Sequence, residues 1–188
     1  MIELNNWHIH NNNPANWRID DHKLEVQVSE GNIWGTCSAD VDNLFVHPSP
    51  RNTASSGNYM AQVAINLIPK RTYEQAGLGI IWDTDNYIKI SKEMFNGKLS
   101  LVFVIEQGGQ PSVKQLIEYP ADDVVVRIEK RDGLVTTSYA ESADGKWTTV
   151  GTATALEGIE KGLMLYTFGG SKLAPSVASF SSFVFSQE

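Results

Sequence analysis

The clearest hydrophobic pattern in the chain spans residues 75–90, where two apolar runs rich in Ile, Trp and Tyr flank four polar residues at positions 83–86. This arrangement is typical of two antiparallel β-strands joined by a tight turn. Because successive side chains of a strand point to opposite faces, one face of the hairpin is expected to belong to the core. The expected core residues are Leu78, Ile80, Ile88 and Ile90, and the opposite face carries Gly77, Gly79, Tyr87 and Lys89. Tyr87 and Lys89 are therefore expected to face solvent or a cleft. The two glycines are expected to leave room there for another backbone or a ligand.

Comparable strand patterns recur along the chain. Apolar and polar residues alternate at 22–28 and 58–68, and further strand-like segments stand at 98–106, 112–119, 124–130, 134–139, 162–168 and 177–185. Asn96-Gly97 and Asp132-Gly133 are typical of two-residue hairpin turns between such strands. Residues 33–46 give a weaker signal, and residues 47–57 are predicted to form a surface loop. Since no helical period exceeds about two turns, the pattern predicts an all-β sandwich that occupies residues 1–188 as one domain. The pattern alone leaves a jelly roll and an up-and-down barrel open.

Charge and composition narrow the range of partners. The chain has 22 acidic and 15 basic residues, a formal net charge of -7, and its basic residues are scattered. Nucleic acids and membranes are therefore not expected as partners. The first residues lack the basic region and apolar core of a signal peptide, and no apolar run approaches the roughly 20 residues of a membrane span. We expect a soluble, cytoplasmic protein, in which the lone Cys37 forms no internal disulfide and is a small buried side chain.

Several short motifs follow one another across nearly the whole chain. They are Trp17-Arg18-Ile19 with Leu24-Glu25-Val26, Gln75-Ala76-Gly77-Leu78, Asp85-Asn86-Tyr87-Ile88-Lys89, Asp144-Gly145-Lys146-Trp147 and Phe180-Ser181-Ser182-Phe183. In order and spacing, the set resembles the concanavalin A-like jelly-roll domains found at the C-terminus of family 43 β-xylosidases and in the related DUF1349 proteins of unknown activity. The resemblance implies a two-sheet antiparallel jelly-roll sandwich of the lectin and glucanase type, with an oligo- or polysaccharide as its ligand.

The resemblance also bears on cofactors. Members of this group often have an Asp just before the penultimate Phe, which contributes to a structural calcium site. Here Ser179 precedes Phe180, and a hydroxyl is a much poorer calcium ligand than a carboxylate. We predict no cofactor, although a structural calcium ion stays open.

Carboxylates are the first candidates for catalysis, because glycosidases need two of them facing each other at about 5 to 10 Å. Catalytic glucanases on the same jelly roll carry them in a Glu-x-Asp-x-x-Glu strand motif, which is absent from this sequence. Glu129 and Asp132 have another spacing and run into a turn. Asp83 and Asp85 also stand in a turn, where such side chains usually bind the local backbone. The sequence also lacks a Gly-x-Ser-x-Gly elbow and a phosphate-binding glycine loop.

Two histidines have the spacing of metal ligands. His8 and His10 would point to the same side of a strand. No third ligand lies near them in the sequence, and His47 is the distant candidate that could complete a site. We predict a surface strand without a metal.

Aromatic side chains are the better candidates for a ligand site, because sugar rings stack their C–H faces on Trp and Tyr. Most of the five Trp and six Tyr must be core residues. Exposed positions are expected at Trp34, between two glycines, and at Tyr73, in a loop after a proline. The full set of candidate ligand-binding residues is Tyr87, Trp34, Trp82, Arg127, Lys89 and Tyr73. Of these, Trp82 also fits a packing role in phase with Leu78, and Arg127 fits an exposed sheet face.

Three functional hypotheses follow from the sequence. The first is a non-catalytic domain that binds a carbohydrate on one sheet face. The second is a glycoside hydrolase or polysaccharide lyase that uses acidic or His residues on that face, so enzymatic activity stays open. The third is a structural module that forms a homodimer through a flat sheet.

Overall fold

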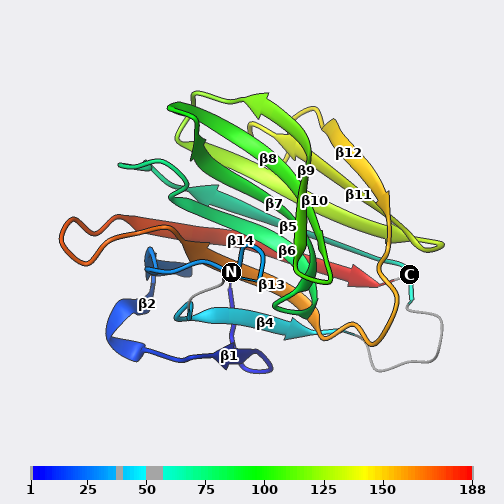
Figure 1. The fold of residues 1–188 in the computed structure, drawn as a ribbon, viewed down its shortest axis with the longest axis horizontal. Helices are drawn as coiled ribbons and strands as arrows, with labels where there is room; N and C mark the ends of the chain where they lie inside the picture. The colour runs from blue at the N-terminus through cyan, green and yellow to red at the C-terminus, as the bar shows by residue number, and fades with distance from the viewer. Residues whose placement is uncertain (1, 37–39, 50–56, 188) are drawn as a thin grey trace.

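The computed structural model describes residues 2–36, 40–49 and 57–187, which form two seven-stranded antiparallel sheets packed face to face (Figure 1). Sheet A has the order β1 (His8–His10), β4 (Leu44–Pro48), β13 (Gly162–Phe168), β6 (Gln75–Asp83), β7 (Asn86–Phe95), β8 (Lys98–Gln107) and β9 (Gln110–Glu118). Sheet B has the order β12 (Thr148–Thr154), β11 (Leu134–Ala140), β10 (Asp123–Arg131), β5 (Tyr59–Asn66), β14 (Val177–Gln187), β3 (Lys23–Gln27) and β2 (Trp17–Asp20). A short 3-10 helix, η1 (Pro14–Asn16), precedes β2. The prediction of an all-β jelly-roll sandwich is confirmed.

The hairpin turns have the backbone that their sequences require. Asn96 and Gly97, between β7 and β8, have φ angles of 49° and 79°. Asp132 and Gly133, between β10 and β11, have φ angles of 49° and 77°. Positive φ at both central residues is what a two-residue hairpin needs, and Asn, Asp and Gly tolerate it best. These predicted hairpins are confirmed, and they place β7 beside β8 and β10 beside β11.

The space between the sheets is filled by the side chains that the alternating apolar and polar pattern predicts to be core residues. Leu78, Ile80, Ile88 and Ile90 are fully buried there with the alternate residues of β5. Trp82 belongs to the same cluster and is 5% exposed. The predicted core face of the β6–β7 hairpin is therefore confirmed.

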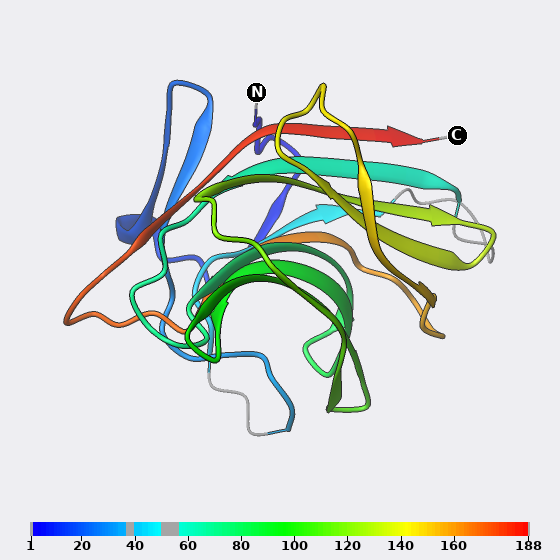
Figure 2. The ribbon, with the colours of Figure 1, turned by 90° about the horizontal axis from the view of Figure 1, so that it is seen from above.

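A second apolar cluster covers the outer face of sheet A, the face turned away from sheet B. It joins side chains of β4, β6, β7, β8 and β13 to residues of the segment before β4, namely Ile33, Val41, Leu44, Val46, Ile81, Tyr87, Val102, Val104, Met164, Tyr166 and Phe168. Figure 2 shows β6, β7 and β8 strongly curved, with the light blue segment before β4 on their side away from sheet B. This face is therefore a covered, hollowed surface rather than an open one.

The two glycines of β6, Gly77 and Gly79, make room for large side chains of this second cluster. A Cβ atom at Gly77 would overlap the Tyr166 hydroxyl, and one at Gly79 would collide with the Met164 methyl group. The expectation of free room for a backbone or ligand at these glycines was wrong, because β13 pairs with β6 and its large side chains occupy the space.

The turn between β6 and β7 has a structural role. One carboxylate oxygen of Asp83 accepts hydrogen bonds from the Asp85 backbone N–H at 2.9 Å and from the Asn86 side chain at 2.8 Å. These bonds fix the chain reversal. The prediction that the two aspartates form the turn is confirmed.

Two predictions fall largely on residues that the structure does not describe. Cys37 and most of the predicted 47–57 loop lie outside the described residues. Within the described part of the chain, no helix is long and apolar enough to cross a membrane.

Candidate functional site

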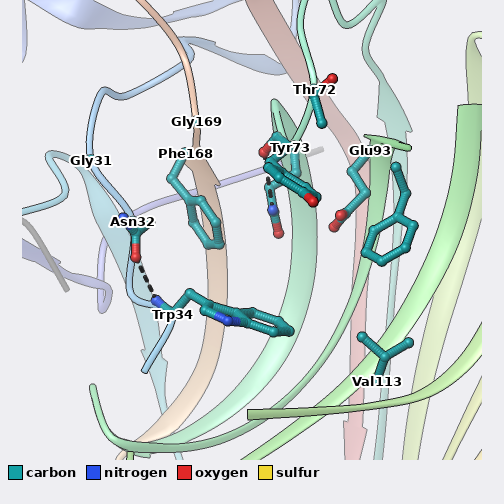
Figure 3. A pocket seen from close by; sticks show the side chains of 11 residues that line it. Gly31, Asn32, Trp34, Thr72, Tyr73, Glu93, Val113, Phe168 and Gly169 are labelled. Atoms are coloured by element: carbon teal, nitrogen blue, oxygen red, sulfur yellow. Dashed lines mark hydrogen bonds between the residues drawn. The ribbon is translucent and has the colours of Figure 1, made fainter. Parts of the chain in front are cut away.

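A pocket of about 490 Å³ lies at one end of the outer face of sheet A. Four aromatic residues line it together with four polar residues, a valine and two glycines: Gly31, Asn32, Trp34, Thr72, Tyr73, Gln75, Glu93, Phe95, Val113, Phe168 and Gly169. Figure 3 shows Trp34 and Phe168 on one side, Glu93 on the other and Tyr73 between them. A concave site of this size, largely apolar with a few convergent polar groups, is typical of small-molecule binding.

The floor of the pocket comes from one row of residues across three neighbouring strands. Phe168 of β13 is paired with Gln75 of β6, and Gln75 is paired in turn with Glu93 of β7. In antiparallel sheets, directly opposed residues point to the same face. Strand register therefore sets an aromatic ring, an amide and a carboxylate side by side.

The loop before β6 forms one wall. Tyr73 has a φ angle of 68°, unusual for a residue other than glycine, and its N–H donates to the Met94 carbonyl at 2.7 Å. Its own carbonyl accepts a hydrogen bond from the Gln75 side chain at 3.1 Å. A Cβ at Gly169, whose φ is 80°, would overlap that carbonyl, so glycine is required where β13 passes the loop. These contacts hold the Tyr73 ring at the rim, where it is 52% exposed.

The opposite wall is the Trp34 loop, which we define as residues 31–36. The Gly35 N–H donates to the Glu106 carboxylate at 3.0 Å, and the Ile33 carbonyl accepts a hydrogen bond from the Tyr87 hydroxyl at 3.3 Å. The single proton of that hydroxyl is shared with the Glu106 carboxylate, which lies at the shorter distance of 2.5 Å. A tyrosine and a glutamate buried under the loop thus anchor it, and Trp34, 38% exposed, reaches into the pocket.

A buried polar network lies beneath the pocket. The Lys89 ammonium is fully buried, donates to the Gln75 side-chain oxygen at 2.6 Å, and lies 5.3 Å and 5.2 Å from the ring centroids of Tyr166 and Phe168. Burial lowers the pKa of Lys89 to about 8, against the opposing attraction of Glu93 and Glu106.

The Glu93 carboxylate is the acidic group of the pocket. It accepts a hydrogen bond from the Ser91 hydroxyl at 2.7 Å. Burial raises the pKa of Glu93, while Lys89 and the Ser91 hydroxyl act in the opposite direction. A carboxylate in such surroundings can accept hydrogen bonds from ligand hydroxyls or pair with a cation.

The six residues predicted from the sequence separate into three places. Trp34 and Tyr73 line the pocket, and the prediction that both are exposed is confirmed. Tyr87 and Lys89 lie on the same face of sheet A and point away from the inter-sheet core, as predicted. The expectation that they reach solvent or a cleft was wrong, because the segment before β4 and the rings of β13 cover them completely.

The other two predicted residues lie elsewhere. Trp82 is packed between the sheets, on the face opposite to the pocket. Arg127 lies on sheet B, where its guanidinium stacks 3.7 Å from the Trp147 ring centroid and donates two hydrogen bonds to Gln62. The structure does not bring either of them to the pocket.

Several lining residues were missed by the sequence reasoning. Glu93 and Phe95 continue the alternation that begins with Tyr87 and Lys89 on β7, so extending that pattern by six positions beyond Lys89 would have found both. Gln75 and Phe168 had no such signal, because their place depends on the pairing of β6 with β13.

A second, smaller hollow of about 380 Å³ lies at the other end of β6. His8 and His10 line it together with Asp83 and Lys161. His47 points to the opposite face of sheet A and packs against the rings of Trp7, Phe183 and Phe185, so it does not join the other two histidines. Within the described ranges, no three His, Cys, Asp or Glu side chains are placed to hold a metal ion.

Comparisons with solved structures show the same fold in proteins of low sequence identity. A functionally unknown protein from Saccharomyces cerevisiae matches 100% of this chain and 99% of its own, with 17% identity and a TM-score of 0.75. The GH43 BlXynB protein from Bacillus licheniformis matches with 16% identity and a TM-score of 0.77, and the chain covers 36% of its length. The carbohydrate binding module CBM66 from Bacillus subtilis matches 96% of this chain and 94% of its own, with 13% identity and a TM-score of 0.60.

Sequence comparisons complete the assignment. A search of curated proteins found no significant match. The family model for DUF1349, a protein of unknown function, matches residues 10–183, nearly the full length of both sheets. The chain therefore belongs to the DUF1349 family.

Proposed function

We propose that this protein is a non-catalytic carbohydrate-binding domain and that the sugar binds in the pocket on the outer face of sheet A. The observation that carries the proposal is the composition of that pocket: four aromatic rings, from Trp34, Tyr73, Phe95 and Phe168, around the carboxylate of Glu93. Aromatic faces stack on the C–H faces of sugar rings, and a carboxylate accepts hydrogen bonds from their hydroxyls.

The comparisons support this proposal through the fold. One structural neighbour is named as a carbohydrate binding module, and another is a GH43 protein of which this chain covers about a third. Because folds host many functions, the pocket itself has to carry the argument for a sugar ligand.

The alternative of a glycoside hydrolase or lyase receives no specific support from the pocket. Hydrolysis requires two carboxyl groups on either side of the scissile bond. Glu93 is the one carboxylate among the residues that line this pocket. Glu106 lies beneath the Trp34 loop, and one of its carboxylate oxygens is already bound to Tyr87 and Gly35.

Two further expectations are kept as proposals. A cytoplasmic location can be tested by fractionation of cells that express the full chain. A homodimer can be tested by sedimentation, which would give twice the 20.8 kDa mass of the chain.

Isothermal titration calorimetry with a panel of mono- and oligosaccharides tests the proposed function. We expect binding of at least one sugar at millimolar or lower concentration, with a loss of about tenfold or more in Trp34→Ala. Stacking of a nucleic-acid base on one aromatic side chain contributes about 1 to 3 kcal/mol, and we expect a sugar ring stacked on Trp34 to contribute a comparable amount. Trp147→Ala is the matched control, since Trp147 lies with Arg127 on sheet B.

Two outcomes would count against the proposal. Absence of binding across the panel would reject a carbohydrate ligand. Equal affinity of Trp34→Ala and the unaltered protein, with a loss in Trp147→Ala, would move the site to sheet B, where Arg127 was one of the predicted residues.

A further inference from the structure

Among the described residues, the pocket is lined by one charged side chain, and that side chain is almost completely buried. Glu93 is its one carboxylate, is 3% exposed, and accepts a hydrogen bond from Ser91. No Lys, Arg or His appears among the residues that line the pocket. A ligand that enters it therefore meets a carboxylate without a cationic side chain on the walls.

The lysine and two glutamates around the base of the pocket have one more formal negative charge than positive charge. Lys89 is the cation of this region, and it faces two carboxylates, Glu93 on its own strand and Glu106 on β8. Lys89 donates to Gln75, while one oxygen of Glu106 is buried without a hydrogen-bond partner. The lysine thus attracts both acids without neutralising both, and a further cation would be favoured.

The rings that line the pocket also suit a cation. An ammonium group is attracted to the faces of Trp, Tyr and Phe, and cages of such rings are a known means of recognising amines. Trp34, Tyr73, Phe95 and Phe168 come from four separate segments, and the Tyr73 and Phe95 rings meet edge to face at 5.8 Å. In Figure 3 the Glu93 carboxylate points into the space that Trp34, Tyr73 and Phe168 surround.

We propose that the sugar bound in this pocket carries a free amino group, so that its ammonium pairs with Glu93 while its ring stacks on the surrounding aromatic side chains. This inference rests on the proposed function, since it names the class of carbohydrate that the same pocket takes. Acidic sugars are disfavoured, because a second carboxylate would be brought beside Glu93 without a cation on the walls.

Three sugars that differ at one position test the inference by calorimetry at about pH 7: glucosamine, N-acetylglucosamine and glucose. A hydrogen bond to a charged group contributes about 1.5 to 3 kcal/mol, so glucosamine should bind roughly 10-fold to 100-fold more tightly than the other two. In Glu93→Gln the preference should fall to about twofold or less, whereas Glu118→Gln, an exposed acid on β9, should keep it.

The pH profile adds a readout that does not depend on a variant. The ionised form of Glu93 is needed for pairing, and the groups that face it are Lys89, Ser91 and Tyr87 on β7 and Tyr166 on β13. Because burial raises the pKa of Glu93, glucosamine binding should weaken on going from about pH 7 to about pH 5, while glucose binding stays constant.

The outcomes distinguish a failure of the amino-sugar inference from a failure of the proposed function. Equal affinity for glucosamine, N-acetylglucosamine and glucose would overturn the amino-sugar inference and leave carbohydrate binding intact. Tetramethylammonium chloride serves as a probe for the cation alone. Binding of tetramethylammonium without binding of any sugar, or binding of neither, would overturn both.

Discussion

Lys89 is a fully buried amine whose pKa is lowered to about 8 from the ordinary value of 10.5, mainly by burial. Between these two pH values the unfolded chain binds a proton that the folded chain does not. The free energy of unfolding should therefore rise with pH across that window, by on the order of 3 kcal/mol when the transition is complete. Lys92, whose pKa is also lowered to about 8, acts in the same direction.

Comparison with Lys89→Met isolates the contribution of this residue. We expect urea unfolding between about pH 7.5 and pH 10 to show the unaltered protein gaining stability relative to Lys89→Met as the pH rises. Lys98→Met is the control, because Lys98 is 66% exposed and Glu118 raises its pKa, which moves its titration above this range. Parallel pH curves for Lys89→Met and the unaltered protein would contradict the prediction.

The Glu106 carboxylate is one of the groups that attach the Trp34 loop to sheet A. In Glu106→Ala the Gly35 N–H loses its acceptor, and the Tyr87 hydroxyl keeps only the Ile33 carbonyl at 3.3 Å. Each buried polar group without a partner costs about 1 to 3 kcal/mol, so the loop should open more often. We expect faster hydrogen exchange at the Gly35 amide and about tenfold weaker sugar binding through the displaced Trp34.

The control for this element is Glu118→Ala on the neighbouring strand β9, which removes an exposed ion pair with Lys98. Such pairs contribute little, so exchange at Gly35 should not change. Unchanged exchange in Glu106→Ala would show that packing of Ile33, rather than the carboxylate, holds the loop.

Alternation of side chains was sufficient to predict the strands that have one apolar face. The two faces of β6 and β7 were predicted correctly, because Leu78, Ile80, Ile88 and Ile90 leave no other register for the hairpin. Strand β12, with the sequence Thr-Thr-Val-Gly-Thr-Ala-Thr, was missed, since Val150 is its one large apolar residue and gives no period.

The candidate site was predictable only where local sequence determines it. Trp34 and Tyr73 were found because glycine and proline mark their loops. The place of Phe168 beside Gln75 depends on pairing across more than 90 residues, and the cover over Lys89 comes from the Tyr166 and Phe168 rings of the same distant strand. A single sequence carries no signal for contacts of that range, so the floor of the pocket and its cover had to come from the structure.

At the scale of the whole molecule, both sheets bury their inner faces in one shared cluster, so neither sheet should be stable alone. Leu78 on β6 and Leu24 on β3 test this, because both side chains are fully buried in that cluster but belong to different sheets. Replacing either by Ala should lower the free energy of unfolding by about 2 to 5 kcal/mol through lost burial and the cavity left behind.

The Leu78→Ala and Leu24→Ala variants also test whether residues 1–188 unfold as one cooperative domain. Tryptophan fluorescence, to which the buried Trp82 contributes, and far-ultraviolet circular dichroism should report the same urea midpoint in the unaltered protein, and both midpoints should shift together in Leu78→Ala and in Leu24→Ala. Separate midpoints in either variant would mean that one sheet unfolds before the other. The pocket would then rest on sheet A alone, and Leu24→Ala would weaken sugar binding less than Leu78→Ala at equal loss of stability.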